Sequence, residues 1–185
     1  PNSNWLAEVC ENGDPKAKRE IRIHDVNSGE LRWVLGREDL APRFLSWSPD
    51  GNRLAASGME KTAIWSLAAR TPEVEEIFEG QGAIWSPDGS MLAVARQGGS
   101  WDALSGQQFA NFAGGVAWAP NSKKIAVGCP DGIIRTYEVD MTGIRPERVL
   151  RGHTSEIWSV SWSSDGQWLA SCGLRDETVR IWKAN

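Results

Sequence analysis

A short unit that recurs four times constrains the fold of this 185-residue chain more than any other feature of its sequence. Each copy places a tryptophan at the end of an apolar run and follows it with a turn resembling Ser-Pro-Asp-Gly; the copies are Leu45–Gly51, Ala83–Gly89, Val116–Ser122 and Val160–Gly166. Proline fixes φ in such a turn, and Asp, Asn and Gly tolerate left-handed φ. An apolar pair resumes shortly after each turn. Each copy is therefore predicted to form a β-hairpin.

A third strand with its own aromatic residue follows three of these elements, at 63–65, 135–137 and 180–182, and an earlier copy lies at 21–25. The hairpin tryptophans at 47, 85, 118 and 162 are 38, 33 and 44 residues apart. A four-stranded propeller blade takes about 40–45 residues, and no helical periodicity persists here for even three turns. Eleven tryptophans against one tyrosine also indicate the copying of a small unit. The sequence thus predicts an all-β repeat fold.

The last copy carries a further set of motifs. Gly152-His153 precedes the hairpin, Leu169-Ala170-Ser171 follows the turn, and Asp176 stands six residues before Trp182. Together with the hairpin unit, these closely resemble one full WD repeat. The resemblance extends over nearly the whole chain and implies a β-propeller of four-stranded antiparallel blades. It also implies a hydrogen-bonded tetrad inside the last blade, formed by His153, Ser171, Asp176 and Trp182. Such a resemblance is specific for fold and says little about function.

About five repeats are expected, with approximate boundaries 1–36, 37–74, 75–107, 108–146 and 147–185. The fourth keeps the spacing from Asp131 to Tyr137 but has no Gly-His pair, and the third leaves little room for a third strand before Trp101. The first and last repeats read as partial blades, so both termini are expected to fall within a blade. We therefore expect a segment of a larger propeller, completed by further blades from the same chain or another subunit, or a sequence with gaps.

Composition and charge disfavour several functional classes. The formal net charge of -4 and the pI of about 5.3 give no electrostatic drive toward nucleic acid or an anionic membrane. No apolar stretch reaches the 18 residues that a membrane span needs. The cysteines, Cys10, Cys129 and Cys172, form no C-x-x-C pair and are expected to be buried, reduced core thiols rather than metal ligands. Reduced thiols favour a cytoplasmic location.

Motifs for catalysis are absent from the sequence: it contains no G-x-S-x-G, no G-x-x-x-x-G-K-[ST] and no H-E-x-x-H. Of the two histidines, His153 is assigned to the structural tetrad and His24, which aligns with the third-strand tryptophans, to packing. We expect no catalytic residues, no metal and no cofactor, and hence no enzyme.

One tryptophan departs from the pattern of the others. The four hairpin tryptophans are expected to be core wedges between blades. Trp158 falls at an irregular step of the first strand, where it is either an exposed anchor or an additional core residue. By position in the repeats, Arg43, Glu156, Trp158 and Arg175 are the candidates for a partner-binding face. The alternative for Glu156 and Arg175 is a simple ion pair at the surface.

The expected function is a non-catalytic scaffold or adaptor that binds another protein or peptide, because that is what the resemblance implies. The alternative is an accessory propeller of a prolyl-peptidase-type hydrolase or of a periplasmic TolB-like protein, whose turns are similar. The third-strand tryptophan and the Gly-His pair argue against this alternative. A nucleic-acid binder is disfavoured by the acidic pI.

Overall fold

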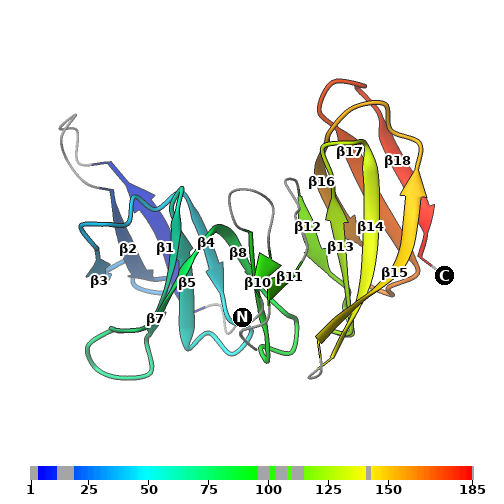
Figure 1. Ribbon diagram of the computed structural model, residues 1–185. Helices are drawn as coiled ribbons and strands as arrows, with labels where there is room; N and C mark the ends of the chain where they lie inside the picture. Colours follow the sequence, from blue (N-terminus) through cyan, green and yellow to red (C-terminus); the bar gives the residue numbers. More distant parts are fainter. Residues whose placement is uncertain are drawn as a thin grey trace. The chain divides into compact units, whose positions relative to one another are not determined.

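The computed structural model describes residues 4–11, 19–95, 101–102, 108–109, 115–140 and 143–184. Within these ranges the secondary structure is β throughout, with eighteen strands and no helix (Figure 1). The all-β prediction is confirmed. The chain divides into two compact units, one formed by residues 1–85 and 92–97 and the other by residues 86–91 and 98–185. No helix in the described ranges is long and apolar enough to cross a membrane.

The first unit contains a three-stranded and a four-stranded antiparallel sheet and a hairpin. The first sheet has the order β1(Trp5–Cys10), β2(Glu20–Asp25) and β3(Leu31–Leu35). The second sheet has the order β4(Phe44–Trp47), β5(Arg53–Ser57), β6(Lys61–Ser66) and β7(Glu73–Glu79). The hairpin pairs β8(Gln81–Trp85) with β9(Leu92–Ala95) and derives from the third repeat.

The second unit contains the sheets of the fourth and fifth repeats. The fourth sheet has the order β12(Val116–Trp118), β13(Lys124–Gly128), β14(Ile133–Asp140) and β15(Gly143–Arg151). The fifth sheet has the order β16(Ile157–Trp162), β17(Trp168–Gly173) and β18(Val179–Lys183). The two-residue strands β10(Trp101–Asp102) and β11(Gln108–Phe109) pair with each other, so the short third repeat does contain a third strand.

The repeated turn explains why each copy folds as a hairpin. In the fifth sheet the Ser163 hydroxyl donates to Asp165 Oδ1 at 2.6 Å, and Gly166 N donates to Ser163 O at 2.9 Å. Gly166 has a φ of 69°, in the left-handed region that glycine occupies without steric cost. In the fourth sheet Ser122 takes the same position with a φ of 60°. The turn geometry is therefore encoded locally, by the residues predicted to form it.

Each unit has a core between neighbouring sheets. In the first unit Ile21 and Ile23 of β2 pack with Leu54 of β5 and Trp65 of β6. In the second unit Ala126 and Ile134 of the fourth sheet pack with Ile157, Val160 and Leu169 of the fifth. The hairpin tryptophans lie on the first strand of their sheets, as predicted; Trp47 and Trp162 border these cores, and Trp85 and Trp118 are buried.

The prediction of buried cysteines is correct for only one of the three. All are free thiols, but Cys10 and Cys172 are half-buried whereas Cys129 is buried. Cys10 shares a strand face with Leu6, which is exposed, so no described sheet covers that face. Cys172 pairs with the exposed Val179 on a similarly uncovered face of the fifth sheet. Burial at these positions depends on a neighbouring sheet.

Candidate functional site

Four side chains of the fifth sheet form one hydrogen-bonded chain. His153 precedes β16, Ser171 lies on β17, Asp176 on the loop after β17, and Trp182 on β18. His153 Nδ1 lies 2.6 Å from Asp176 Oδ2, and His153 Nε2 lies 2.8 Å from Ser171 Oγ. Trp182 Nε1 donates to Ser171 Oγ at 2.8 Å. These are the residues that the resemblance assigned to a tetrad.

Hydrolases also use an Asp-His-Ser series of hydrogen bonds, in which the serine attacks the substrate. Burial of His153 and Ser171 excludes such nucleophilic catalysis here. The side chain of His153 is 0% exposed and Ser171 is 3% exposed. In addition, the lone pair of Ser171 Oγ accepts the Trp182 indole N–H. A nucleophile must reach a substrate carbonyl, and this hydroxyl cannot. The network therefore joins the three strands and the loop, and its role is structural.

Asp176 is the centre of that network. Its carboxylate accepts hydrogen bonds from His153, from Thr154 N at 3.1 Å, and from Thr178 N and Oγ1 at 3.1 and 3.0 Å. Burial by itself would raise the pKa of Asp176, but these donors outweigh it and hold the pKa well below its usual range. The carboxylate is therefore charged at neutral pH and fixes the loop between β17 and β18.

The second sheet contains a buried hydroxyl cluster at a different place, where it contacts the start of the third repeat. Ser57 Oγ and Thr62 Oγ1 lie 2.9 Å apart, Thr62 Oγ1 donates to Gly80 O at 3.0 Å, and Ala83 N donates to Ser57 Oγ at 3.0 Å. All four residues are buried. This cluster was not predicted from sequence, because Ser57 and Thr62 align with Cys172 and Val179 of the last repeat and not with members of the tetrad.

One rim of the fifth sheet, formed by the start of β16 and the loop after β17, carries three of the four candidate binding residues. A register shift between Ile157 and Ser159 leaves Trp158 out of the ladder, and its side chain is 65% exposed. Leu174 N donates to Glu156 O at 2.8 Å, which holds the loop after β17 against the start of β16. The exposed position of Trp158 in the described chain counts against the core alternative.

Ser155 is the residue of this rim that sequence reasoning missed. Its Oγ accepts the backbone N–H groups of Arg175 and Asp176, each at 3.1 Å. It thereby fixes Arg175, whose side chain is exposed, on the same rim as Glu156 and Trp158. No ion pair or hydrogen bond between the Glu156 and Arg175 side chains occurs in the described structure, so the surface-pair alternative finds no support there.

Arg43 and His24 lie in the first unit. Arg43 is exposed and its N–H donates to Ser57 O at 2.8 Å. The packing role expected of His24 needs correction: its Nε2 lies 3.2 Å from Glu8 Oε1, on the uncovered face of the first sheet. Because no described sheet packs on that face, the imidazole pairs with a carboxylate and does not enter the core.

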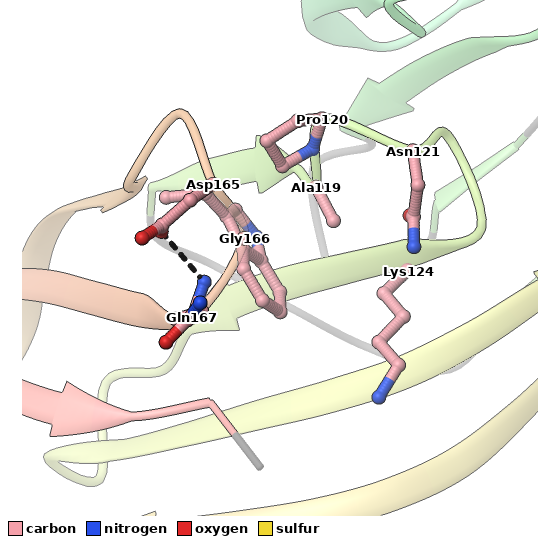
Figure 2. Close-up of a pocket in the computed structure, with 8 residues that line it drawn as sticks. Ala119, Pro120, Asn121, Lys124, Asp165, Gly166 and Gln167 are labelled. Atoms are coloured by element: carbon pink, nitrogen blue, oxygen red, sulfur yellow. Dashed lines mark hydrogen bonds between the residues drawn. The ribbon is translucent and has the colours of Figure 1, made fainter.

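Among the described residues, no three His, Cys, Asp or Glu side chains are grouped so that they could hold a metal ion. The second unit contains a pocket of about 240 Å³ between two of the repeated turns, and Figure 2 shows its lining. It is lined by Ala119, Pro120, Asn121, Lys124, Trp162, Asp165, Gly166 and Gln167.

Antiparallel sheets of three and four strands, four of which open with the same hairpin, define a repeat protein of the β-propeller class. A family model described as "WD domain, G-beta repeat" matches residues 144–183, which include the His-Ser-Asp-Trp chain. The chain belongs to the WD-repeat β-propeller family.

Similar proteins support this assignment. The chain is 31% identical over 160 residues to "Cell division cycle 20.1, cofactor of APC complex" of Arabidopsis thaliana, covering 78% of this chain and 34% of that protein. It is 30% identical over 114 residues to "tRNA (guanine-N(7)-)-methyltransferase non-catalytic subunit wuho" of Drosophila erecta, covering 55% of this chain and 27% of that protein. The chain therefore spans about a third or less of the length of these relatives.

A solved structure, "Crystal Structure of Mitotic Checkpoint Complex", contains a chain with the same fold. It matches with a TM-score of 0.77 and 19% identity, covering 98% of this chain and 62% of that chain.

Proposed function

We propose that the chain is a non-catalytic interaction module that binds another protein or peptide through the rim of the fifth sheet. The observation that carries the proposal is the exposed Trp158, which lies on a bulge of β16, two residues after Glu156, at the end of the sheet where the ordered loop carries Arg175. An exposed aromatic beside one acid and one base is the composition of many binding hot spots. Arg43 is a further candidate contact on the first unit.

The names of the similar proteins support an adaptor function. One is a cofactor of a complex, one is a non-catalytic subunit, and the matching solved chain belongs to a checkpoint complex. The buried Ser171 and the absence of catalytic motifs from the sequence also favour a non-enzymatic role. The hydrolase-associated propeller is the less favoured alternative, because the fifth sheet carries the WD-type tetrad. The free thiols favour the cytoplasm.

Replacing Trp158 by alanine tests the proposed binding face. Because the side chain is exposed, the melting temperature is expected to change little, whereas affinity for a captured partner should fall by about 2 kcal/mol or more. Isothermal titration calorimetry and thermal denaturation measure the two quantities. Replacement of Val26, which is also exposed, provides the matched control. Loss of stability with unchanged affinity would make Trp158 a packing residue and the assignment wrong.

We also propose that further WD-type blades, from the same chain or another subunit, cover the open face of the fifth sheet. Val179 and Ile181 on this face are 72% and 63% exposed. Ile181 stands just before Trp182 as Ile64 stands before Trp65, and Ile64 is 2% exposed. The difference is that β8 packs on the second sheet, whereas no described strand packs on this face of the fifth. An apolar face of this kind favours association.

Sedimentation of the 185-residue chain tests this proposal. We expect self-association that rises with concentration and that Ile181→Lys weakens, with little change in melting temperature. The control Ile64→Lys should instead unfold the chain, because it buries a charge without a partner. A chain that stays monomeric at all concentrations would count against the proposed interface.

A further inference from the structure

The pocket in the second unit offers an aromatic face and a carboxylate. It lies between the β12–β13 turn and the β16–β17 turn, where Figure 2 shows Asn121 and Lys124 on one side and Asp165 and Gln167 on the other. Trp162 also lines it, and its indole N–H already donates to Ala117 O at 3.1 Å. The part of Trp162 left for a ligand is therefore the ring surface.

In the first unit, an arginine lies over the hairpin tryptophan that corresponds to Trp162. Arg53 follows Trp47 by six residues, as Lys124 follows Trp118 by six. The Arg53 guanidinium lies over the ring of Trp85, 5.9 Å from its centroid, and Arg53 Nε pairs with Glu75 Oε2 at 3.1 Å. Trp85 holds the position in its hairpin that Trp162 holds in the last one. The Arg53–Trp85 pair is thus one observed case of a guanidinium over a hairpin tryptophan of this chain.

At the open junction, lysine takes the place of arginine. Lys124 Nζ is held by Glu147, at the bulge of β15 that corresponds to the bulge of β7 at Glu75. Glu147 also accepts a hydrogen bond from Thr136 Oγ1 at 3.1 Å. The ammonium is a compact charge and lacks the planar surface that stacks on indole. The structure records no cation over the Trp162 ring among the residues that it describes.

The charges around the pocket favour a cation. Hydrogen bonds from the Ser163 hydroxyl and Gln167 N lower the pKa of Asp165, so this carboxylate is ionised at neutral pH. The opposing charge of Lys124 is compensated by Glu147. An incoming guanidinium would meet the negative face of the indole and the carboxylate of Asp165 together.

We propose that this pocket binds an arginine side chain from an extended segment of a partner protein, with the guanidinium placed over Trp162 as Arg53 is placed over Trp85. This inference rests on the proposed function in one respect, namely that the binding partner is a protein. The pocket lies at the β16–β17 turn, which is the opposite end of these strands from the loop that carries Arg175. The two sites can therefore be tested separately.

The test uses two short peptides of identical sequence, one with a central arginine and one with citrulline, which keeps the shape and removes the charge. Titration into the 185-residue chain is followed by the NMR signal of the Trp162 indole N–H, assigned by its loss in Trp162→Phe. We expect the arginine peptide to bind about two- to fivefold more tightly than the citrulline peptide. Asp165→Asn, which retains the turn acceptor as Asn121 does, should reduce that difference.

Lys124→Arg provides the sharpest variant, because the chain would then fill its own pocket. We expect the Trp162 signal to shift without peptide and the arginine peptide to bind at least about fivefold more weakly. Equal binding of the two peptides, or unchanged binding to Lys124→Arg, would overturn the proposal. If Trp158→Ala did not reduce the affinity for a partner, the expected results of both peptide titrations would be unchanged. The two proposals can therefore fail independently.

Discussion

Replacing His153 by alanine is expected to lower the free energy of unfolding by about 1–3 kcal/mol. The imidazole is fully buried and bridges Asp176 and Ser171, so its removal leaves a buried carboxylate and a buried hydroxyl without their partner. Urea denaturation followed by tryptophan fluorescence measures the change. The loss should appear in stability, and the affinity of the Trp158 rim for a partner should fall only as far as the fold is lost.

His24→Ala is the matched control for this experiment. His24 also faces a carboxylate, that of Glu8, but it lies on an uncovered face of the first sheet. A pair of this kind contributes less than about 1 kcal/mol to stability. The free energy of unfolding of His24→Ala should therefore be close to that of the parent chain. Equal effects of the two substitutions would contradict the structural role assigned to the buried network.

Gly128→Ala is expected to destabilise the second unit by about 1–3 kcal/mol through overpacking. A Cβ at this position would lie 2.4 Å from Ile157 Cγ2 and 2.7 Å from Ile157 Cβ. Ile157 is fully buried in the core between the fourth and fifth sheets, so it has no free space into which to move. Equilibrium unfolding again provides the measurement.

Gly36→Ala controls for the general effect of adding a methyl group to glycine. A Cβ at Gly36 would meet no atom within 4 Å, and its backbone is outside the left-handed region. This variant should be as stable as the parent or slightly more so, since alanine restricts the unfolded chain. If Gly128→Ala were equally neutral, the result would contradict the close packing of Gly128 against Ile157 between the fourth and fifth sheets.

Much of the fold could be predicted from sequence because its signals are local. The Ser163–Asp165 hydrogen bond and the left-handed Gly166 lie within four residues, so the turn requires no distant contact. The tetrad could be predicted for another reason. Its four residue types occur together in only one repeat of the chain, at spacings that resemble those of a known family. The buried hydroxyl pair of Ser57 and Thr62, which lies at a different place in its repeat, had no comparable signal in the sequence.

Burial of the sheet faces could not be predicted from the repeats alone. Val179 and Ile134 occupy matching strand positions, yet one is exposed and the other is buried, because a strand face is covered only where another sheet packs on it. The same reason accounts for the half-buried thiols of Cys10 and Cys172. Local alternation specifies that a face is apolar, and only tertiary packing decides whether it is enclosed.

The sequence by itself determined the hairpins, the strand order within each repeat and the residues of the buried network, because these follow from turn chemistry and spacing. The tertiary structure alone decided which side chains are available to a partner. Trp158 is exposed because a bulge displaces it from the ladder, and Ser155 orders the neighbouring loop through two backbone groups. The pocket at Trp162 forms between the turns that follow Trp118 and Trp162, which are 44 residues apart in the sequence. Each outcome depends on contacts between segments distant in sequence.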